Sequence, residues 1–220
     1  MLGLHALSVS PETILILEVG LVLGALFAIF GDSSESRKFR PFIGIVAIVS
    51  ALSLGRVLFG PLPNIQPVTI GVLLVGATYG ARKGIGIGIL IAIVSNISLG
   101  SGMWTPFQAI GWGTIALGGA LAANQLIINE KLSLRNLMIA GFISAFVFDF
   151  IVSLSILVGD PNLGLFLSYL ITGLPFDLLH AAGNIVIAVT LGPSMYNILL
   201  RSLSPTNLKI RSGANESRVE

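Results

Sequence analysis

Long apolar stretches constrain the fold of this chain more than any other feature of its sequence. Seven such stretches alternate with short polar connections. Only 10% of the 220 residues are charged, whereas a soluble domain carries about 25%, and the mean hydropathy is +0.95. The sequence therefore predicts an all-α integral membrane protein, folded as a bundle of transmembrane helices.

The seven predicted spans differ in length. They cover about residues 11–30, 42–59, 67–79, 84–97, 106–126, 134–158 and 175–200. A helix needs about 20 residues to cross the hydrocarbon core, so the third and fourth spans are short. Irregular backbone at membrane depth is tolerated only inside protein, so the Pro/Gly-rich connections at 60–66 and 98–105 are expected to dip into the bundle. The weakly apolar residues 163–173 predict a short re-entrant or interfacial piece.

Lysine and arginine are distributed unevenly among the connections. The connections at 31–41, 80–83 and 127–135 and the C-terminal tail contain them, whereas the N-terminus and residues 60–66, 98–105 and 159–174 contain none. Because cytoplasmic loops carry an excess of these residues, we predict a multi-pass protein of the cell membrane, with its N-terminus outside and its C-terminus in the cytoplasm. No basic residue precedes the first span, so a cleaved signal peptide is not expected.

Polar side chains gather in the outer half of the predicted bundle. At a rise of ~1.5 Å per residue, Arg56 and Asp149 lie roughly 20 Å above the cytoplasmic starts of their helices. The outer turns of other spans carry Asn96, Gln108, Trp112, Asp177, His180 and Asn184. An ionisable residue inside a membrane costs about 2.5–3.5 kcal/mol on insertion and usually faces the bundle interior or a wet cavity. The pattern therefore predicts a cluster of polar side chains inside the outer half of the bundle.

Each of these residues also has a purely structural interpretation. Arg56 could form a buried ion pair with Asp149 or Asp177, because breaking such a pair is strongly destabilising whether or not a ligand contacts it. His180 and the asparagines could join helices by hydrogen bonds. The two tryptophans could anchor the protein at the membrane interface.

A stripe of small residues marks one face of the second span. Ala47, Ala51 and Gly55 follow one another at intervals of four, so they share a helix face. Small residues at this spacing let another helix approach closely. The stripe predicts either a docking face for a partner or close packing inside the bundle.

Several function classes lack their sequence signatures. The chain contains no phosphate-binding P-loop, no H-E-x-x-H zinc motif and no G-x-S-x-G nucleophile motif. It has no cysteine, and no lysine in the seventh span that could form a Schiff base with retinal. We therefore expect neither an enzyme nor a resident cofactor or metal, and no nucleic-acid partner.

Two polar loops and the last span together resemble a known family. The composite comprises Gly55-Arg56, the run 63–69, Ser95-Asn96, Gly100, Gly102, the run 104–108 and Trp112, and it is joined by the run 174–184. It resembles the substrate-binding (S) component of energy-coupling factor transporters. The resemblance covers about residues 42–203 and implies a domain of six core transmembrane helices. Residues 1–41 would then be an extra N-terminal helix and loop, and 204–220 a disordered cytoplasmic tail.

The resemblance also implies a function. Such a protein captures a vitamin or similar micronutrient from outside and passes it to a transmembrane coupling protein driven by two ATPase subunits. Its docking face would be Ala47, Ala51 and Gly55, and Trp104 would stack on the solute. The implied binding residues are Arg56, Asn64, Gln66, Thr69, Asn96, Trp104, Thr105, Gln108, Trp112, Asp149, Asp177, His180 and Asn184.

Two other hypotheses stay open at this point. The chain could be a self-sufficient secondary transporter or channel in which Asp149, Asp177 and His180 relay protons. It could also be a membrane enzyme that uses His180 and Asp177, although the sequence contains no complete catalytic set. Neighbouring genes for ATPases and a coupling protein would favour the transporter subunit.

Overall fold

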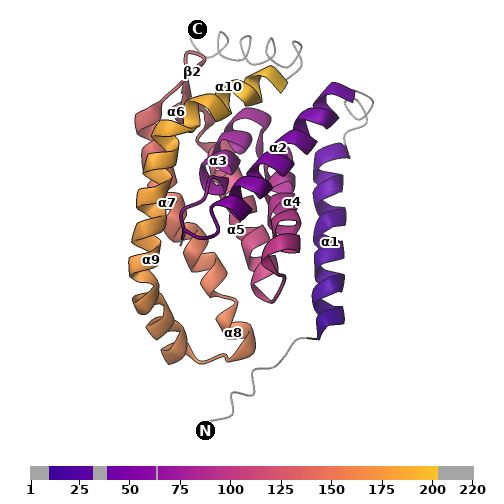
Figure 1. The fold of residues 1–220 in the computed structure, drawn as a ribbon, viewed down its shortest axis with the longest axis vertical. Coiled ribbons are helices and arrows are strands. Elements are labelled where there is room, and N and C mark those ends of the chain that lie inside the picture. The colour runs from indigo at the N-terminus through magenta and orange to yellow at the C-terminus, as the bar shows by residue number, and fades with distance from the viewer. Residues whose placement is uncertain (1–9, 32–38, 63, 203–220) are drawn as a thin grey trace.

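A computed structural model describes residues 10–31, 39–62 and 64–202, and within these ranges the protein is almost entirely helical (Figure 1). The predicted tail at 204–220 lies outside the described residues. The first helix, α1 (Pro11–Phe30), begins as the sequence predicts, since Ser10 caps it by accepting a hydrogen bond from the Thr13 amide. Helix α1 packs against α4 (Ala81–Leu99), where Gly86 leaves room for the backbone of Ala25.

Helix α3 (Val68–Tyr79) forms the centre of the bundle. Every residue from Val68 to Thr78 is buried, and α3 contacts α4, α5 (Trp104–Leu121) and α10 (Gly192–Ser202). It approaches α5 so closely that a Cβ atom on Gly76 would collide with the carbonyl of Ala116, and one on Gly119 with the carbonyl of Leu73. Small residues thus replace a layer of side chains between these helices, as is common in membrane bundles.

Of the two connections expected to dip into the protein, the one between α2 (Phe39–Leu58) and α3 does so, whereas Gly100 and Ser101 in the other are exposed. Pro67 is buried, Gln66 is half-buried, and Ile65 packs against Gly183 in the middle of α9 (Leu163–Thr190). Figure 1 shows this connection partway along the bundle rather than at its end. The short α3 therefore does not need to cross a whole bilayer by itself.

Helix boundaries differ from the predicted spans at both ends of α5. The helix begins at Trp104, ends at Leu121 and is followed by the short α6 (Ala123–Leu126). The predicted polar connection that follows forms a small antiparallel hairpin of β1 (Ile127–Ile128) and β2 (Lys131–Leu132). Its turn residues Asn129 and Glu130 have φ of 49° and 62°. This hairpin is the one departure from helix among the described elements.

The expected re-entrant piece at 163–173 is wrong, because these residues belong to one continuous helix. Asn162 caps α9 by accepting a hydrogen bond from the Leu165 amide, and the helix then continues through Pro175 to Thr190. Membrane helices tolerate an internal proline because neighbouring groups and local adjustments satisfy the freed backbone. Asp177 therefore lies about 20 Å from the start of α9 rather than in the first turns of a new span.

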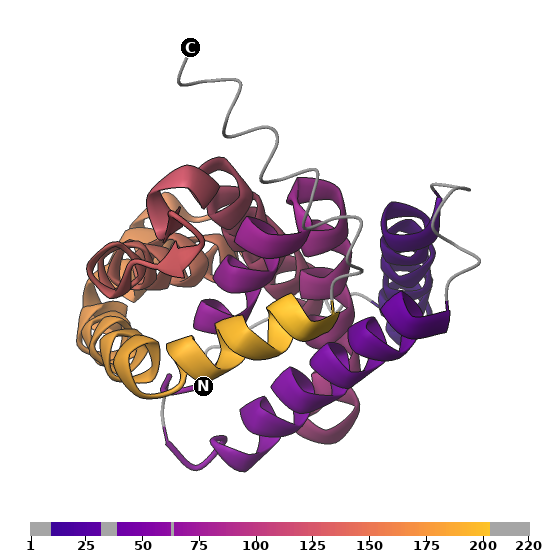
Figure 2. The ribbon, with the colours of Figure 1, turned by 90° about the horizontal axis from the view of Figure 1, so that it is seen from above.

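The last predicted span, 175–200, also divides. Helix α9 ends at Thr190, and α10 turns across the end of the bundle, while α1 stands at one edge (Figure 2). The sixth span runs through α7 (Leu134–Ser153) into the short α8 (Ile156–Gly159). Four segments of the described chain are long and apolar enough to cross a membrane, namely Pro11–Phe30, Ala81–Leu99, Leu134–Val158 and Leu163–Thr190.

The described helix ends next to the basic connections lie at the same end of the bundle. The C-terminal end of α1, the β-hairpin and α10 share one end, whereas α8 and the start of α1 lie at the other (Figure 1). Arg82 belongs to the first end, because its Nη2 donates to the carbonyl of Phe27 at 3.1 Å. At that end Tyr196 also donates its hydroxyl to the carbonyl of Glu130 at 3.0 Å. This arrangement matches the alternation of lysine and arginine along the sequence.

Candidate functional site

Arg56, near the C-terminal end of α2, is the centre of a buried polar network. Its side chain is only 7% exposed. The Nε atom donates to Gln66 Oε1 at 3.1 Å, and Nη1 donates to Ser95 Oγ and Asn96 Oδ1, each at 2.6 Å. These bonds join α2 to the following connection and to α4.

Asn96 extends the network to α5. Its Nδ2 donates to Thr105 Oγ1 and to Gln108 Oε1, both at 2.9 Å. Thr105 Oγ1 also accepts the backbone amide of Gly102 at 3.1 Å, which holds the turn between α4 and α5. Asn96 is 1% exposed and Thr105 0%, so both side chains are fully removed from solvent.

Stacked aromatic rings connect Arg56 to a second polar group. The Arg56 guanidinium lies 4.8 Å from the centroid of the Trp112 ring, a cation–π contact. Trp112 stacks on Phe148 with centroids 4.8 Å apart, and Phe148 meets His180 edge-on at 5.8 Å. The three rings come from α5, α7 and α9, so they also join these helices in the core.

His180 is the centre of the second polar group. A carboxylate only accepts hydrogen bonds, so His180 Nδ1 donates to Asp149 Oδ2 at 2.9 Å. His180 Nε2 is hydrogen-bonded to the Thr69 hydroxyl at 3.0 Å. Asp177 lies beside this group and interacts electrostatically with both Asp149 and His180.

The order of hydroxyl, imidazole and carboxylate is also that of a catalytic triad. Thr69 and His180 are each 1% exposed, however, so no substrate reaches the Thr69 hydroxyl in this arrangement. This burial therefore does not favour a nucleophilic role for Thr69.

The ion pair between Arg56 and an aspartate, one alternative left open by the sequence, does not form within the described residues. Asp149 instead pairs with His180, and Arg56 bonds only to neutral side chains. The physical reason is the direction in which each helix faces, because Trp112 and Phe148 stand between Arg56 and the carboxylates. Equal depth in the bundle, which the sequence predicts, does not ensure contact.

Three other candidate residues lie outside the two polar groups. Asn64 has φ of 57° and donates to the carbonyl of Phe176 at 3.2 Å, which fixes the α2–α3 connection to α9. Asn184 donates to the carbonyl of Gly141 at 2.9 Å and so joins α9 to α7, as a structural interpretation predicts. Trp104 is 46% exposed and packs over Gly102 at the bundle surface.

Two members of the network were absent from the predicted site. Ser95 hydrogen-bonds Arg56, and its position before Asn96 in the resembling motif is a signal that could have identified it. Phe148 links the two polar groups, but the sequence offers no signal that separates it from the other phenylalanines.

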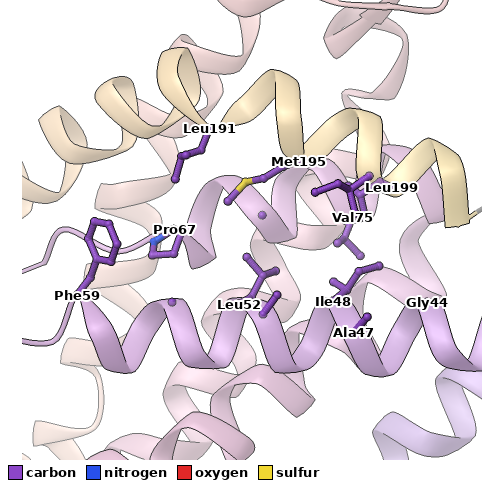
Figure 3. A pocket seen from close by; sticks show the side chains of 14 residues that line it. Gly44, Ala47, Ile48, Leu52, Phe59, Pro67, Val75, Leu191, Met195 and Leu199 are labelled. Atoms are coloured by element: carbon purple, nitrogen blue, oxygen red, sulfur yellow. The ribbon is translucent and has the colours of Figure 1, made fainter.

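A separate apolar groove runs between α2 and α10 (Figure 3). Its volume is about 410 Å³. Ala47, Ala51 and Gly55 line its α2 side, and Leu191, Met195 and Leu199 line the opposite side. Ala47 and Ala51 are exposed, whereas Gly55 is half-buried and lies against Pro67, so only part of the stripe packs within the described chain.

Fold and site together define an all-α protein with helices suited to a membrane and a polar interior at the level of the α2–α3 connection. No group of three or more His, Cys, Asp or Glu side chains within the described ranges is placed to hold a metal ion. No known protein family, curated protein or solved structure matches the chain.

Proposed function

We propose that this protein is the substrate-binding subunit of an energy-coupling factor type importer. In this proposal it lies in the cell membrane with its N-terminus outside and its C-terminus in the cytoplasm. In the same proposal, six core transmembrane helices lie between about residues 42 and 203, and α1 is an additional helix. It captures a vitamin or similar micronutrient from outside and does not itself act as an enzyme.

The observation that carries this proposal is the buried network around Arg56. It joins the α2–α3 connection, α4 and α5. The side chains that do so belong to both parts of the motif that resembles the transporter family. A polar interior built by loops at one level of a membrane bundle suits the recognition of a small polar solute, because orienting polar groups confer specificity in small-molecule sites.

The groove supports the second part of the proposal, a partner that supplies the energy. The chain has no P-loop for ATP. On the smooth face, Ala47 and Ala51 stay exposed and Gly55 is half-buried. We propose that a transmembrane coupling protein with two ATPase subunits docks there through a closely packed helix.

Two measurements test the proposed function. Protein purified in detergent is expected to be stabilised against heating by at least one water-soluble vitamin, since a ligand that binds only the folded state raises its stability. Uptake of that solute by cells is expected to stop when the ATPase subunits are deleted. Absence of stabilisation by the whole vitamin panel would contradict solute binding.

A second candidate, a proton-coupled secondary transporter, is favoured by one specific observation. Asp149, His180 and Thr69 form a continuous hydrogen-bonded chain, with Asp177 alongside. Such chains carry protons in pumps and transporters. Proteoliposomes that contain only this protein decide between the two: solute uptake driven by a pH gradient, and lost in Asp149→Asn, would support the second candidate.

A further inference from the structure

The charge of Arg56 is unbalanced inside the bundle. Its hydrogen-bond partners Gln66, Ser95 and Asn96 are all neutral, and no carboxylate within the described residues pairs with it. Arginine does not lose its proton in proteins, so the positive charge is permanent. Burial of an uncompensated charge costs several kcal/mol.

One end of the guanidinium is available to a ligand. Nε and Nη1 make the three hydrogen bonds to Gln66, Ser95 and Asn96, while Nη2 has no partner among the described side chains. Nη2 is also not fully enclosed. The side-chain atoms of the described chain that are fully enclosed and have no hydrogen-bond partner are Glu18 Oε1, Ser53 Oγ, Thr78 Oγ1, Trp112 Nε1 and Asn184 Oδ1, and Nη2 is not one of them. The side chain therefore keeps both a free donor and a small accessible area.

The surroundings also hold Arg56 in a fixed position. Gln66, Ser95 and Asn96 come from the α2–α3 connection and α4, and Trp112 supports the flat face of the guanidinium. A rigid donor whose orientation is fixed before binding loses little freedom when an anion arrives. Hydrogen bonds between arginine and carboxylate or phosphate are about twice as strong as neutral ones.

We infer that the transported solute carries an anionic group, a carboxylate or a phosphate, which accepts hydrogen bonds from Arg56 Nη2. This inference rests on the proposed function and narrows its substrate class. An anionic solute balances the charge that the protein leaves unpaired, whereas a neutral or cationic solute does not. The same chemistry could come from a free inorganic anion, which the experiment must distinguish.

The test compares acids with their neutral amides on purified protein. The probes are the pairs nicotinate with nicotinamide and biotin with biotinamide, the remaining water-soluble vitamins, and inorganic phosphate alone. Melting temperature identifies binders, and titration calorimetry measures their affinity. We expect an anionic vitamin to bind at least tenfold more tightly than its neutral counterpart.

Two variants connect this preference to Arg56. Arg56→Gln keeps hydrogen-bonding capacity without the charge and is expected to reduce the preference for the acid to less than threefold. Gln66→Glu places a carboxylate beside Nε, so it should weaken binding of the acid at least tenfold while the ligand-free melting temperature stays the same or rises. The second variant keeps the test decisive if the first does not fold.

Each outcome separates the inference from the proposed function. Equal binding of acid and amide, or tight binding of a neutral solute alone, would overturn the anionic inference and leave solute binding intact. Stabilisation by inorganic phosphate alone, without any solute preference, would overturn it in favour of a free anion. No stabilisation by any probe would contradict solute binding itself.

Discussion

Replacement of Asn96 by alanine tests whether the Arg56 network determines the stability of the bundle. Asn96 accepts one charged hydrogen bond from Arg56 and donates two neutral ones, to Thr105 and Gln108. A neutral hydrogen bond contributes about 1 kcal/mol and a charged one about 1.5–3 kcal/mol. Their sum is about 3.5–5 kcal/mol, whereas the mean of about 0.6 kcal/mol measured for bonds between membrane helices gives roughly 2 kcal/mol.

We therefore expect Asn96→Ala to lower the free energy of unfolding by about 2–5 kcal/mol. The assay is reversible unfolding by SDS in mixed micelles, followed by tryptophan fluorescence, since Trp112 lies against Arg56. Asn184→Ala, which removes one bond to Gly141, should cost only about 1 kcal/mol.

Ser53→Ala is the matched control, because Ser53 is 4% exposed but its hydroxyl has no partner among the described residues. Its effect should lie within about 0.5 kcal/mol of zero. If Asn96→Ala costs no more than Ser53→Ala, the network does not hold α2, α4 and α5 together, and the reasoning from its hydrogen bonds is refuted.

Three further predictions concern orientation, coupling and the solute. A cysteine at Ser101 should react with an impermeant thiol reagent from outside, while one at Ser133 stays protected; the reverse pattern would contradict the orientation. Ala51→Trp fills the α2–α10 groove and should abolish uptake with solute affinity unchanged, and parallel loss of affinity would show an internal packing role. Trp104→Ala should weaken solute binding at least tenfold without lowering the ligand-free melting temperature, since this side chain is 46% exposed; calorimetry showing unchanged affinity would assign Trp104 to the membrane interface.

The depth of the polar side chains could be predicted from the sequence, but their partners could not. Counting residues along helices places Arg56 and Asp149 at one level, and in the structure Trp112, Phe148 and His180 link the two side chains. The same counting misplaced Asp177, because α9 begins earlier than predicted. Which side chains meet depends on the rotation of each helix about its axis. That rotation is set by close contacts such as Gly76 against Ala116, and no local pattern encodes them.

Helix breaks were the least predictable feature of the fold. Pro175 suggests the start of a helix, because in water an internal proline costs about 3 kcal/mol. In the structure, Pro175 sits inside α9, and the actual break comes at Leu191, between Thr190 and Gly192. Trp104 shows the opposite error, since the expected loop residue is the first residue of α5. In both cases tertiary packing decides the boundary.

The close approach of α3 and α5 has a consequence for how this sequence can change over time. At Gly76 and Gly119, any side chain would strike the backbone of the facing helix, so even alanine is excluded without moving a helix. At Gly20 and Gly24 in α1, nothing lies within 4 Å, and many residue types fit there. Saturation mutagenesis with selection for folded protein should therefore retain glycine at the first two positions while the α1 positions diversify freely.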